Sequence, residues 1–386
     1  MRFISGPRQC GKTTLAREKL KAEKTEQLYY LWDERSVRNH YRDNELFFTQ
    51  DSPPIQTKQW VCFDEIHKMP KWKNILKGIF DSSDNHYHFI ITGSAKLSVI
   101  KKAGDSLAGR YFTFHLMPLT LMEVTKESPD EPAVPDSAEN FIELKLSSKS
   151  SHHEQMKDLL EYSGFPEPFI SQSKIFHSKW AENYIDTVIK EDIGALTRII
   201  DREYLSELYR ILPEMTGSPI SESSLASHIQ VSPPTIKNYL KKLEDFYLIF
   251  LLKPYSKNIK RSLLRASKCY LYDWTRNKEE SFQFENYIAM ELKTRINLWN
   301  DRMGEKFDLF YIRNKQKEET DFLISKKDKP WMLIETKLKD QTIAHHHFSN
   351  AFTLGNIPFV QLCKEPGIAS IQKKGFFRIS ANTFFT

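Results

Sequence analysis

Short apolar segments alternate with polar, helix-compatible stretches through the first 115 residues. The apolar segments lie at residues 3–4, 28–31, 60–63 and 88–92. Strands that alternate with helices in this way are typical of a parallel sheet with crossover helices. The pattern therefore predicts an α/β domain over residues 1–125.

The pattern changes three times after this domain. Residues 126–153 are rich in proline, serine and acidic residues, which predicts a linker or insertion outside the core. Apolar positions at helical spacing then predict a helical subdomain, or lid, over residues 154–215. Residues 216–275 indicate two helices joined by a tight turn and followed by a hairpin, with Ser232 suited to cap the second helix. This order is typical of a winged helix-turn-helix.

Residues 276–386 predict a further α/β domain. One long helix is expected at residues 284–299. Strand-like segments follow at 307–313, 320–325 and 331–337.

The composition agrees with several globular domains. A chain of 386 residues is long enough for about two to four domains, and 40% hydrophobic with 27% charged residues exclude collagen-like and wholly disordered classes. The four cysteines are widely spaced and predict neither a disulfide framework nor a zinc site. No apolar run is long enough to span a bilayer, and the chain does not open on a secretory signal. We therefore expect a cytoplasmic protein without membrane contact.

A phosphate-binding loop follows the first apolar segment. The residues that match the pattern G-x-x-x-x-G-K-[ST], with the threonine after it, are Gly6, Pro7, Arg8, Gln9, Cys10, Gly11, Lys12, Thr13 and Thr14. The glycines let backbone N–H groups converge on phosphates, and the N-terminus of the next helix adds its positive dipole end. Lys12 is expected to reach the β- and γ-phosphates, and the Thr13 hydroxyl to bind Mg²⁺. The loop thus predicts a site for ATP and Mg²⁺.

Three further segments extend this site to hydrolysis. Segment 60–63 runs into Asp64, expected to hold Mg²⁺, and Glu65, expected to activate the attacking water. Thr92 or Ser94, at the end of segment 88–92, is placed to sense the γ-phosphate. Arg110 is either an arginine finger, which neutralises charge during phosphoryl transfer, or a structural arginine.

The segments GPRQCGKTTL, CFDEIHK, IITGSA and AGRYFTFHLMPLTLMEV follow one another in that order. Together with residues 163–168, 191–193 and 268–273, they resemble the prokaryotic AAA+-related P-loop ATPases that carry a C-terminal domain of unknown function. The resemblance implies an AAA+-like core followed by a helical lid. Two features depart from the family: the first strand begins at Met1, so that a flank before it is absent or the start is misassigned, and Trp274 follows Asp273 where small residues are usual.

The net charge of +6 can be traced to one segment. Residues 221–270 hold nine Lys and Arg but only three acidic residues, an excess of six. In a winged helix, the helix that begins near Pro234 is expected to contact DNA. The residues predicted to contact DNA are Lys237, Lys241, Lys242, Lys257, Lys260 and Arg261. The alternative is a solvated face on a spacer between proteins.

The last domain carries acidic residues at a spacing that suits a metal site. Asp321 precedes Glu335 by fourteen residues, which suits neighbouring antiparallel strands, and Lys337 shares a strand face with Glu335. Glu285 shares a helix face with apolar residues and is expected to point inward, in preference to Glu291. Glu285, Asp321 and Glu335 are the predicted metal ligands, and Lys337 has a predicted catalytic role. This region resembles PD-(D/E)XK nucleases, which implies a restriction-endonuclease-like fold.

Two other features of this domain are interpreted as structural. Consecutive histidines at 345–347 cannot all point one way on a helix, so we expect a solvated turn rather than a metal cluster. The phenylalanines near the end of the chain are expected in the core or an edge strand.

Three functions agree with these patterns. The first is an ATP-hydrolysing, DNA-associated protein with a nuclease-like tail. The second is an ATP-switched DNA-binding regulator or protein-interaction scaffold whose tail does not cleave. The third is a ring ATPase that acts on proteins, a homo-oligomer in which Arg110 completes a neighbour's site.

Overall fold

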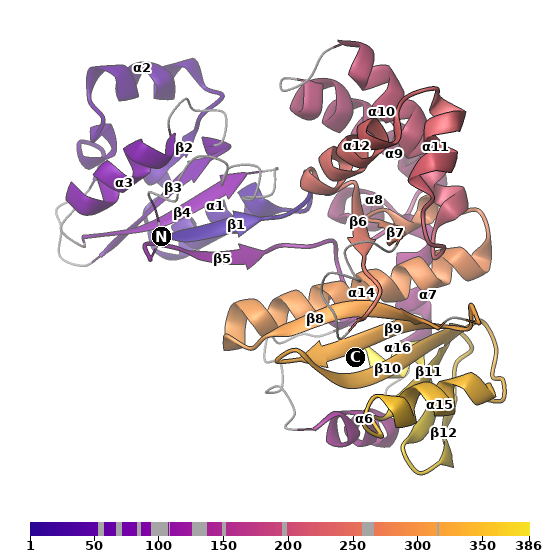
Figure 1. Cartoon of the computed structure of the whole chain (residues 1–386). Helices are drawn as coiled ribbons and strands as arrows, with labels where there is room; N and C mark the ends of the chain where they lie inside the picture. Colours follow the sequence, from indigo (N-terminus) through magenta and orange to yellow (C-terminus); the bar gives the residue numbers. More distant parts are fainter. Residues whose placement is uncertain are drawn as a thin grey trace. The chain divides into compact units, whose positions relative to one another are not determined.

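The computed structural model consists of two compact units, whose elements are labelled in Figure 1. The first unit is Met1–Met117 with Asp245–Tyr247, and the second is Pro118–Glu244 with Leu248–Thr386. Among the described residues, no helix is both long and apolar enough to cross a membrane. All four cysteines are buried, and none of them forms a disulfide. The structure describes residues 1–52, 58–66, 72–82, 86–93, 107, 109–125, 137–148, 152–194, 199–256, 266–314 and 316–386.

The first unit contains a five-stranded parallel sheet with the strand order β2-β3-β4-β1-β5. Its strands are β1 (Arg2–Ser5), β2 (Tyr29–Leu31), β3 (Gln59–Asp64), β4 (Tyr87–Gly93) and β5 (Phe112–His115). Its α-helices are α1 (Lys12–Ala22), α2 (Arg35–Asp43) and α3 (Trp72–Ser82). The predicted α/β domain with a parallel sheet is confirmed.

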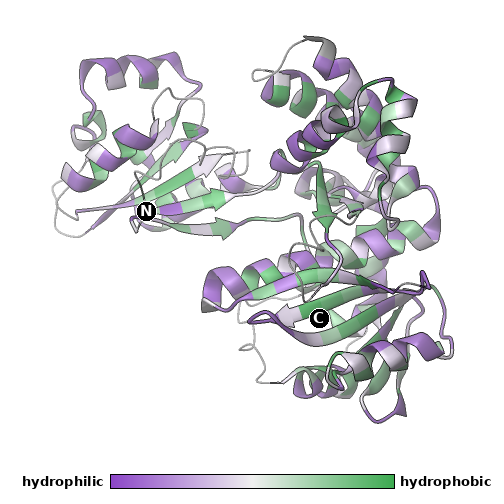
Figure 2. Ribbon diagram, viewed as in Figure 1, coloured by the Kyte–Doolittle hydropathy of each residue, from purple (hydrophilic) through white to green (hydrophobic). Residues whose placement is uncertain are grey.

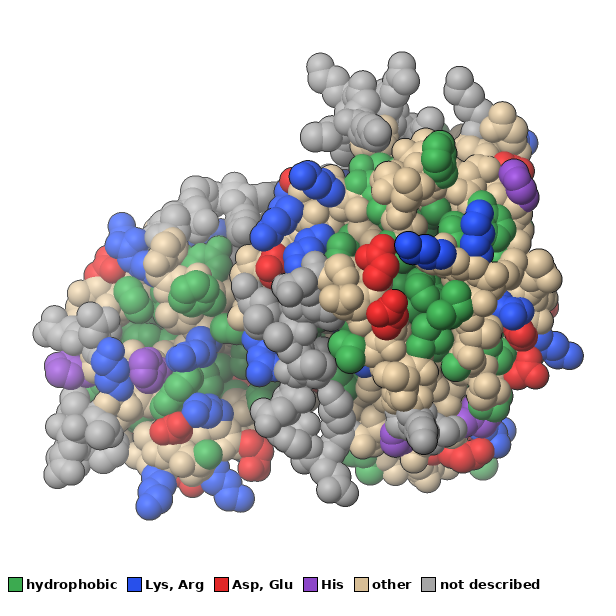
Figure 3. Space-filling view, turned by 90° about the horizontal axis from the view of Figure 1, so that it is seen from below, with side chains coloured by type: hydrophobic (Ala, Val, Ile, Leu, Met, Phe, Trp, Pro, Cys, Tyr) green, Lys and Arg blue, Asp and Glu red, His purple; other side chains and the backbone are tan. Residues whose placement is uncertain are grey.

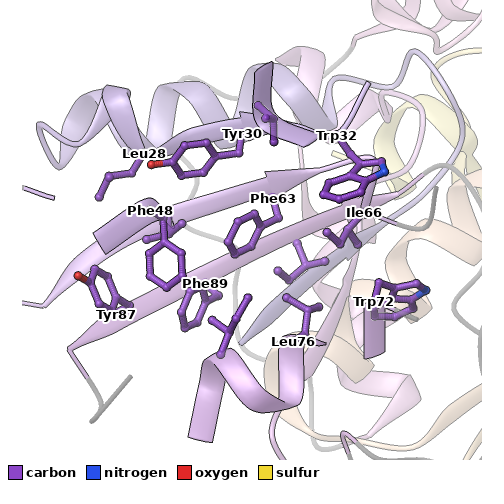
Figure 4. Packing of buried hydrophobic residues seen from close by; sticks show 14 of the residues in the cluster. Leu28, Tyr30, Trp32, Phe48, Phe63, Ile66, Trp72, Leu76, Tyr87 and Phe89 are labelled. Carbon is purple, nitrogen blue, oxygen red and sulfur yellow. The ribbon is translucent and has the colours of Figure 1, made fainter. Parts of the chain in front are cut away.

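Helices cover both faces of this sheet because alternate strand residues point to opposite sides. Phe63 and Phe89 lie on one face, where they pack in a cluster with Leu76 of α3 (Figure 4). Cys62 and Ile90 lie on the other face against Ala16 and Leu20 of α1. Figure 2 shows the resulting pattern, with apolar strands between helices that are polar on their outer sides. This packing holds the carboxyl ends of β1, β3 and β4 in fixed positions.

The second unit begins with helices. They are α5 (Leu121–Thr125), α6 (Ala138–Ser147), α7 (His153–Tyr162), α8 (Pro166–Ser171), α9 (Lys174–Thr187), the π-helix η4 (Val188–Ile193), α10 (Ile199–Ile211), α11 (Glu222–Ile229) and α12 (Pro233–Asp245). Strands β6 (Ile249–Leu252) and β7 (Lys268–Leu271) then pair antiparallel. Ser232 accepts a hydrogen bond from the backbone N–H of Thr235 in the first turn of α12, as its predicted capping role requires.

A mixed six-stranded sheet completes the second unit, in the order β12-β13-β11-β10-β9-β8. The elements of this tail are α14 (Glu280–Met303), β8 (Phe307–Arg313), β9 (Glu319–Lys326), β10 (Lys329–Lys337), α15 (His345–Thr353), β11 (Phe359–Cys363), β12 (Ala369–Lys373), β13 (Phe376–Ser380) and α16 (Ala381–Phe384). Strands β8, β9 and β10 are antiparallel neighbours, whereas β10, β11 and β13 run parallel. The long helix and the three strands predicted after it are present.

The prediction that residues 126–153 lie outside the core is wrong for part of the segment. Residues 138–147 form α6, and Ser137 caps it by accepting a hydrogen bond from Asn140 N. The Phe141 ring packs 5.7 Å from Trp299 of α14 and 5.5 Å from Phe384 of α16. The prolines and acidic residues that dominate the composition precede α6, so they concealed a short helix that belongs to the tail's core.

Candidate functional site

The predicted phosphate-binding loop joins the end of β1 to the first turn of α1. A Cβ atom added to Gly6 would lie 1.9 Å from the carbonyl oxygen of Leu116, so the loop requires glycine there. Gly11 has a φ of 95°, in the left-handed region, just before α1 begins. Both glycines that define the motif are therefore required by the backbone path, and the N–H groups at the N-terminus of α1 begin at Lys12.

The Lys12 side chain is buried within the loop. Its Nζ donates hydrogen bonds to the carbonyl oxygens of Gly6 at 2.9 Å and Pro7 at 2.5 Å. These carbonyls hold the ammonium group inside the loop, where it can exchange carbonyl partners for phosphate oxygens. The expected position of Lys12 at the phosphates agrees with this placement.

Asp64 is the centre of the site. Thr13 Oγ1 donates a hydrogen bond to Asp64 Oδ2 at 2.7 Å, and Thr92 Oγ1 donates to Asp64 Oδ1. The sheet order explains this convergence, because β4 lies between β1 and β3 and therefore brings Thr92 beside the end of β3. The residues predicted to hold Mg²⁺, Thr13 and Asp64, thus present a hydroxyl and a carboxylate oxygen side by side, a donor set that fits Mg²⁺.

Tyr29 is a site residue that the sequence did not reveal. Its hydroxyl donates to Asp64 Oδ2 at 2.5 Å from the neighbouring strand β2, and Arg17 lies over its ring at 4.2 Å. Burial and the Asp64 carboxylate raise the pKa of Tyr29, so the hydroxyl remains a donor. A tyrosine in an apolar strand carries no motif, so only the pairing of β2 with β3 could identify it.

Glu65 follows β3 in a strained backbone conformation. Its φ is 56°, which is unusual for a residue other than glycine, and its backbone N–H donates to Thr92 Oγ1 at 3.4 Å. The backbone of Glu65 thus lies beside Thr92, whose hydroxyl also contacts Asp64, and activation of the attacking water by Glu65 stays a prediction.

Arg110 lies at the opposite edge of the sheet. Its carbonyl oxygen accepts a hydrogen bond from the Met1 amino group at 2.8 Å, before β1 begins, whereas the loop follows the end of β1. Its guanidinium pairs with Asp81 of α3 at 2.8 Å. The structure therefore does not bring Arg110 to the nucleotide site of its own chain, and an arginine finger for a neighbouring chain stays a prediction. Ser94 lies outside the described residues.

The predicted residues of the tail converge at adjacent strands. Strands β9 and β10 are antiparallel, as expected, and Asp321 N donates to Glu335 Oε2 at 3.2 Å. Asp321 Oδ2 accepts hydrogen bonds from both N and Oγ1 of Thr336, at 2.8 and 2.7 Å. Lys337 Nζ lies 2.7 Å from Glu335 Oε1. The sequence thus placed these side chains together correctly.

Glu285 points into the same cluster. A Cβ atom on Gly217 would lie 2.8 Å from both carboxylate oxygens of Glu285, so Gly217 leaves the space that this carboxylate fills. Tyr270 donates its hydroxyl hydrogen to Glu285 Oε1 at 2.7 Å. Glu291, also buried, accepts instead from the backbone N–H of Leu121 at 2.7 Å, at the start of α5. The preference for Glu285 over Glu291 as the inward-facing group of the cluster agrees with this geometry.

A buried lysine lies against two of these carboxylates, Glu285 and Asp321, and against Glu319 beside them. Lys268 of β7 is fully buried, and its Nζ lies 2.5 Å from Glu319, 3.2 Å from Glu285 and 3.7 Å from Asp321. Within the described parts of the chain, no group of three or more His, Cys, Asp or Glu residues is arranged to hold a metal ion. The predicted ligands therefore do not fit a divalent metal in this arrangement, because the ammonium group of Lys268 already lies against Glu285 and Asp321, and that of Lys337 lies against Glu335.

The charges of this cluster explain the pKa shifts of its members. Burial and the nearby Asp321 raise the pKa of Glu285 to about 7 and that of Glu335 to about 8. Burial lowers the pKa of Lys268, but the surrounding carboxylates outweigh it, so that the pKa lies above its usual value. The cationic partners of the four carboxylates are Lys268, Lys337 and, at 3.8 Å from Glu319, Arg313.

The prediction of a solvated histidine turn is wrong. Residues 345–353 form α15, and His347 is buried, with Nδ1 2.9 Å from Thr320 Oγ1 and Nε2 3.8 Å from Glu335 Oε2. Burial lowers the pKa of His347 to about 3, so the ring is neutral at physiological pH. Consecutive helix positions do point in different directions, but two of the three histidines contact β9, because His346 Nε2 also lies 2.8 Å from the carbonyl oxygen of Glu319.

The lysines predicted to contact DNA occupy different environments. Lys237 and Lys241 are exposed on α12, whereas Lys242 is half-buried, with Nζ 4.0 Å from Asp201 of α10. Lys257, Lys260 and Arg261 lie outside the described residues. Lys268, which contributes to the positive charge of this segment, is buried and contacts no solvent.

Comparison with known proteins assigns part of the chain. Residues 1–125 match the family model described as an AAA domain, and residues 153–275 match the model of a domain of unknown function. Together with the geometry around Asp64, the first match supports an ATPase-type domain in residues 1–125, which are similar to AAA domains. An uncharacterized protein of Methanocaldococcus jannaschii is 26% identical over 84% of this chain and 72% of its own length. An uncharacterized protein of Mycobacterium tuberculosis is 24% identical over 85% of this chain and 68% of its own length.

Two solved structures resemble the chain weakly. The Orc1 protein of Aeropyrum pernix in complex with DNA gives a TM-score of 0.29 at 14% identity, over 73% of this chain and 87% of that chain. The DNA clamp loader delta protein of Bacillus subtilis gives a TM-score of 0.26 at 11% identity, over 62% of this chain and 82% of that chain. Both TM-scores are too low to establish a shared fold.

Proposed function

We propose that this protein hydrolyses ATP and that the nucleotide controls its association with DNA. The convergence of Thr13 and Thr92 on Asp64 supports hydrolysis most strongly. Mg²⁺, when bound beside Asp64, neutralises charge on the phosphates. Lys12 binds the phosphate oxygens, and Glu65 accepts the proton of the attacking water. Thr92 links Asp64 to the backbone of Glu65, so it can report the state of the phosphates to the chain.

The helices α11 and α12 and the strands β6 and β7 support the DNA part of the proposal. They follow the order of a winged helix-turn-helix, and exposed Lys237 and Lys241 lie four residues apart, on one side of α12. Figure 3 draws the face of the molecule seen from below, where basic side chains are interspersed with acidic ones, and this is not the side on which Figure 1 labels α11 and α12. We assign the binding of DNA phosphates to Lys237 and Lys241.

Replacing Lys237 and Lys241 together by glutamine should weaken DNA binding. The slope of the logarithm of the binding constant against the logarithm of the salt concentration decreases in magnitude by about one for each phosphate-binding lysine that is removed. Because two lysines are removed here, we expect the magnitude of the slope to decrease by about two. Fluorescence anisotropy of a labelled duplex over a series of salt concentrations, in the presence of ATP and Mg²⁺, measures both affinity and slope.

The matched control replaces two exposed helix lysines outside this segment, Lys157 and Lys179. It removes the same charge, so its slope should stay close to that of the unmodified protein. If the two double variants bind DNA alike, the lysines of α12 form only a solvated face, and the DNA part of the proposal fails.

Metal-dependent cleavage by the tail is the second candidate function. Cleavage is favoured by the close packing of Asp321, Glu335 and Lys337. It is opposed by Lys268, whose ammonium group lies beside Asp321, where a metal ion would bind. A plasmid-nicking assay with Mg²⁺ or Mn²⁺ distinguishes the two functions, and we expect no cleavage with or without ATP. Cleavage that disappears in Glu335→Gln would establish the nuclease.

A further inference from the structure

We propose that Lys268 is the resident cation of the tail's carboxylate cluster, so that this cluster takes no divalent metal ion and the tail acts without metal-dependent cleavage. The cluster consists of Glu285, Glu319 and Asp321, which contact Lys268, and of Glu335, which pairs with Lys337 at 2.7 Å. Its residues come from α14, β9 and β10, whereas Lys268 comes from β7, which precedes the tail in the chain. The proposal concerns the tail alone and does not rest on ATP hydrolysis or DNA binding.

The first argument is position. The Lys268 ammonium lies 2.5 Å from Glu319 Oε1, 3.2 Å from Glu285 Oε1 and 3.7 Å from Asp321 Oδ1. A divalent metal binds carboxylate oxygens at about 2.0–2.6 Å, so a metal shared by the same oxygens would have to lie where the nitrogen is. A divalent metal ion placed beside the Lys268 ammonium would also be repelled strongly by it, because little water is present to screen the two positive charges.

The second argument is that the ammonium group is held in place. Lys268 pairs with Leu252 of β6 and forms a bridge to Pro219, so its backbone is fixed on both sides. The side chain is fully buried, and its Nζ lies 5.5 Å from the centre of the Tyr311 ring. An exposed lysine could leave the cluster and find water at once, whereas Lys268 would have to unpair β7 or cross packed side chains.

The third argument is that the structure around the cluster accommodates the lysine. Gly217 leaves room for the Glu285 carboxylate, and Tyr270 donates to the same oxygen that faces Lys268. Buried charges persist in proteins when they are paired and hydrogen-bonded, and Lys268 is paired with three carboxylates and donates a hydrogen bond to Glu285 at 3.2 Å. The tail thus has its counter-charge supplied by the strand that ends the helix-turn-helix segment.

Manganese binding to the full chain tests this inference. The parent is Asp64→Asn without nucleotide, which removes the carboxylate expected to hold Mg²⁺ at the phosphate-binding loop, so that this loop does not contribute a second metal site. Electron paramagnetic resonance counts free Mn²⁺ in titrations of the parent and of the parent with Lys268→Met, which keeps the length of the side chain and removes its charge. In the parent we expect no Mn²⁺ site with a dissociation constant below about 1 mM. In Lys268→Met we expect one Mn²⁺ site whose dissociation constant is at least about tenfold lower than that limit.

Two controls keep the test specific. Lys326→Met removes a partly buried lysine of the same sheet, 3.9 Å from Glu305, and should gain no site. Adding Asp321→Asn to Lys268→Met should abolish the new site.

The parent alone can overturn the inference, whether or not Lys268→Met folds. Tight Mn²⁺ binding by the parent that disappears in Asp321→Asn would show that the cluster takes a metal despite Lys268. A folded Lys268→Met, checked by circular dichroism, that gains no site would also overturn it, because the lysine would then not be what excludes the metal.

Discussion

Replacing Lys268 by methionine should lower the local free energy of unfolding around β9 and β10 by about 3–5 kcal/mol, the range observed when one partner of a buried ion pair is removed. The ammonium group contacts three carboxylates, and its loss removes the positive charge that all three share, so that Glu285 and Asp321 keep neutral hydrogen-bond donors and Glu319 keeps its pair with Arg313 at 3.8 Å. Hydrogen exchange of peptides from these strands, followed by mass spectrometry, measures the opening free energy of this region separately from the AAA domain.

A matched variant separates this effect from the loss of any lysine. Lys326→Met removes a lysine that is 20% exposed and pairs with Glu305 at 3.9 Å, so its effect should stay within about 1 kcal/mol. Combining Lys268→Met with Glu319→Gln should cost less than the sum of the two single changes, because they act on one ion pair. Equal effects of Lys268→Met and Lys326→Met would contradict the assigned role of Lys268.

Glu65→Gln should retain ATP binding and lose turnover by about 100-fold or more. A positioned general base contributes about 10²–10⁴-fold to proton transfer, and glutamine keeps the size of the side chain while removing its basicity. Filter binding of labelled ATP measures the first property, and release of phosphate measures the second.

The exposed Glu34, at the N-terminus of α2, provides the control. Glu34→Gln changes the same chemistry in the same domain and should turn over ATP at the rate of the unmodified protein. Turnover by Glu65→Gln at a similar rate would show that another group activates the water.

The nucleotide site could be predicted because its chemistry is local in the sequence. The loop between Gly6 and Thr14 carries its own geometric requirements, and Asp64 ends a strand of recognisable composition. The close approach of Thr92 to Asp64 required only the expectation of a parallel sheet whose strands end at one edge. Tyr29 was missed because its role depends on the neighbour of β3, which the pattern of residues does not specify.

In the tail, counting charged residues along the sequence does not show which of them are buried. Lys268 counted toward the excess charge of the helix-turn-helix segment, although it is buried among carboxylates far along the chain. Asp321 and Glu335 were paired correctly because an antiparallel hairpin fixes the spacing of its strands. His347 and α6 were misinterpreted because each depends on packing against elements that are distant in the sequence.

Phosphate release from ATP by the unmodified chain and by Lys12→Ala, with and without Mg²⁺, tests the central claim most directly. The ammonium group of Lys12 is the charge that the loop holds for the phosphates, and the loss of a comparable preorganised donor costs about 10²–10³-fold in rate. The account predicts Mg²⁺-dependent release by the unmodified protein and at least about a 100-fold loss in Lys12→Ala. Equal release by the two proteins would contradict it.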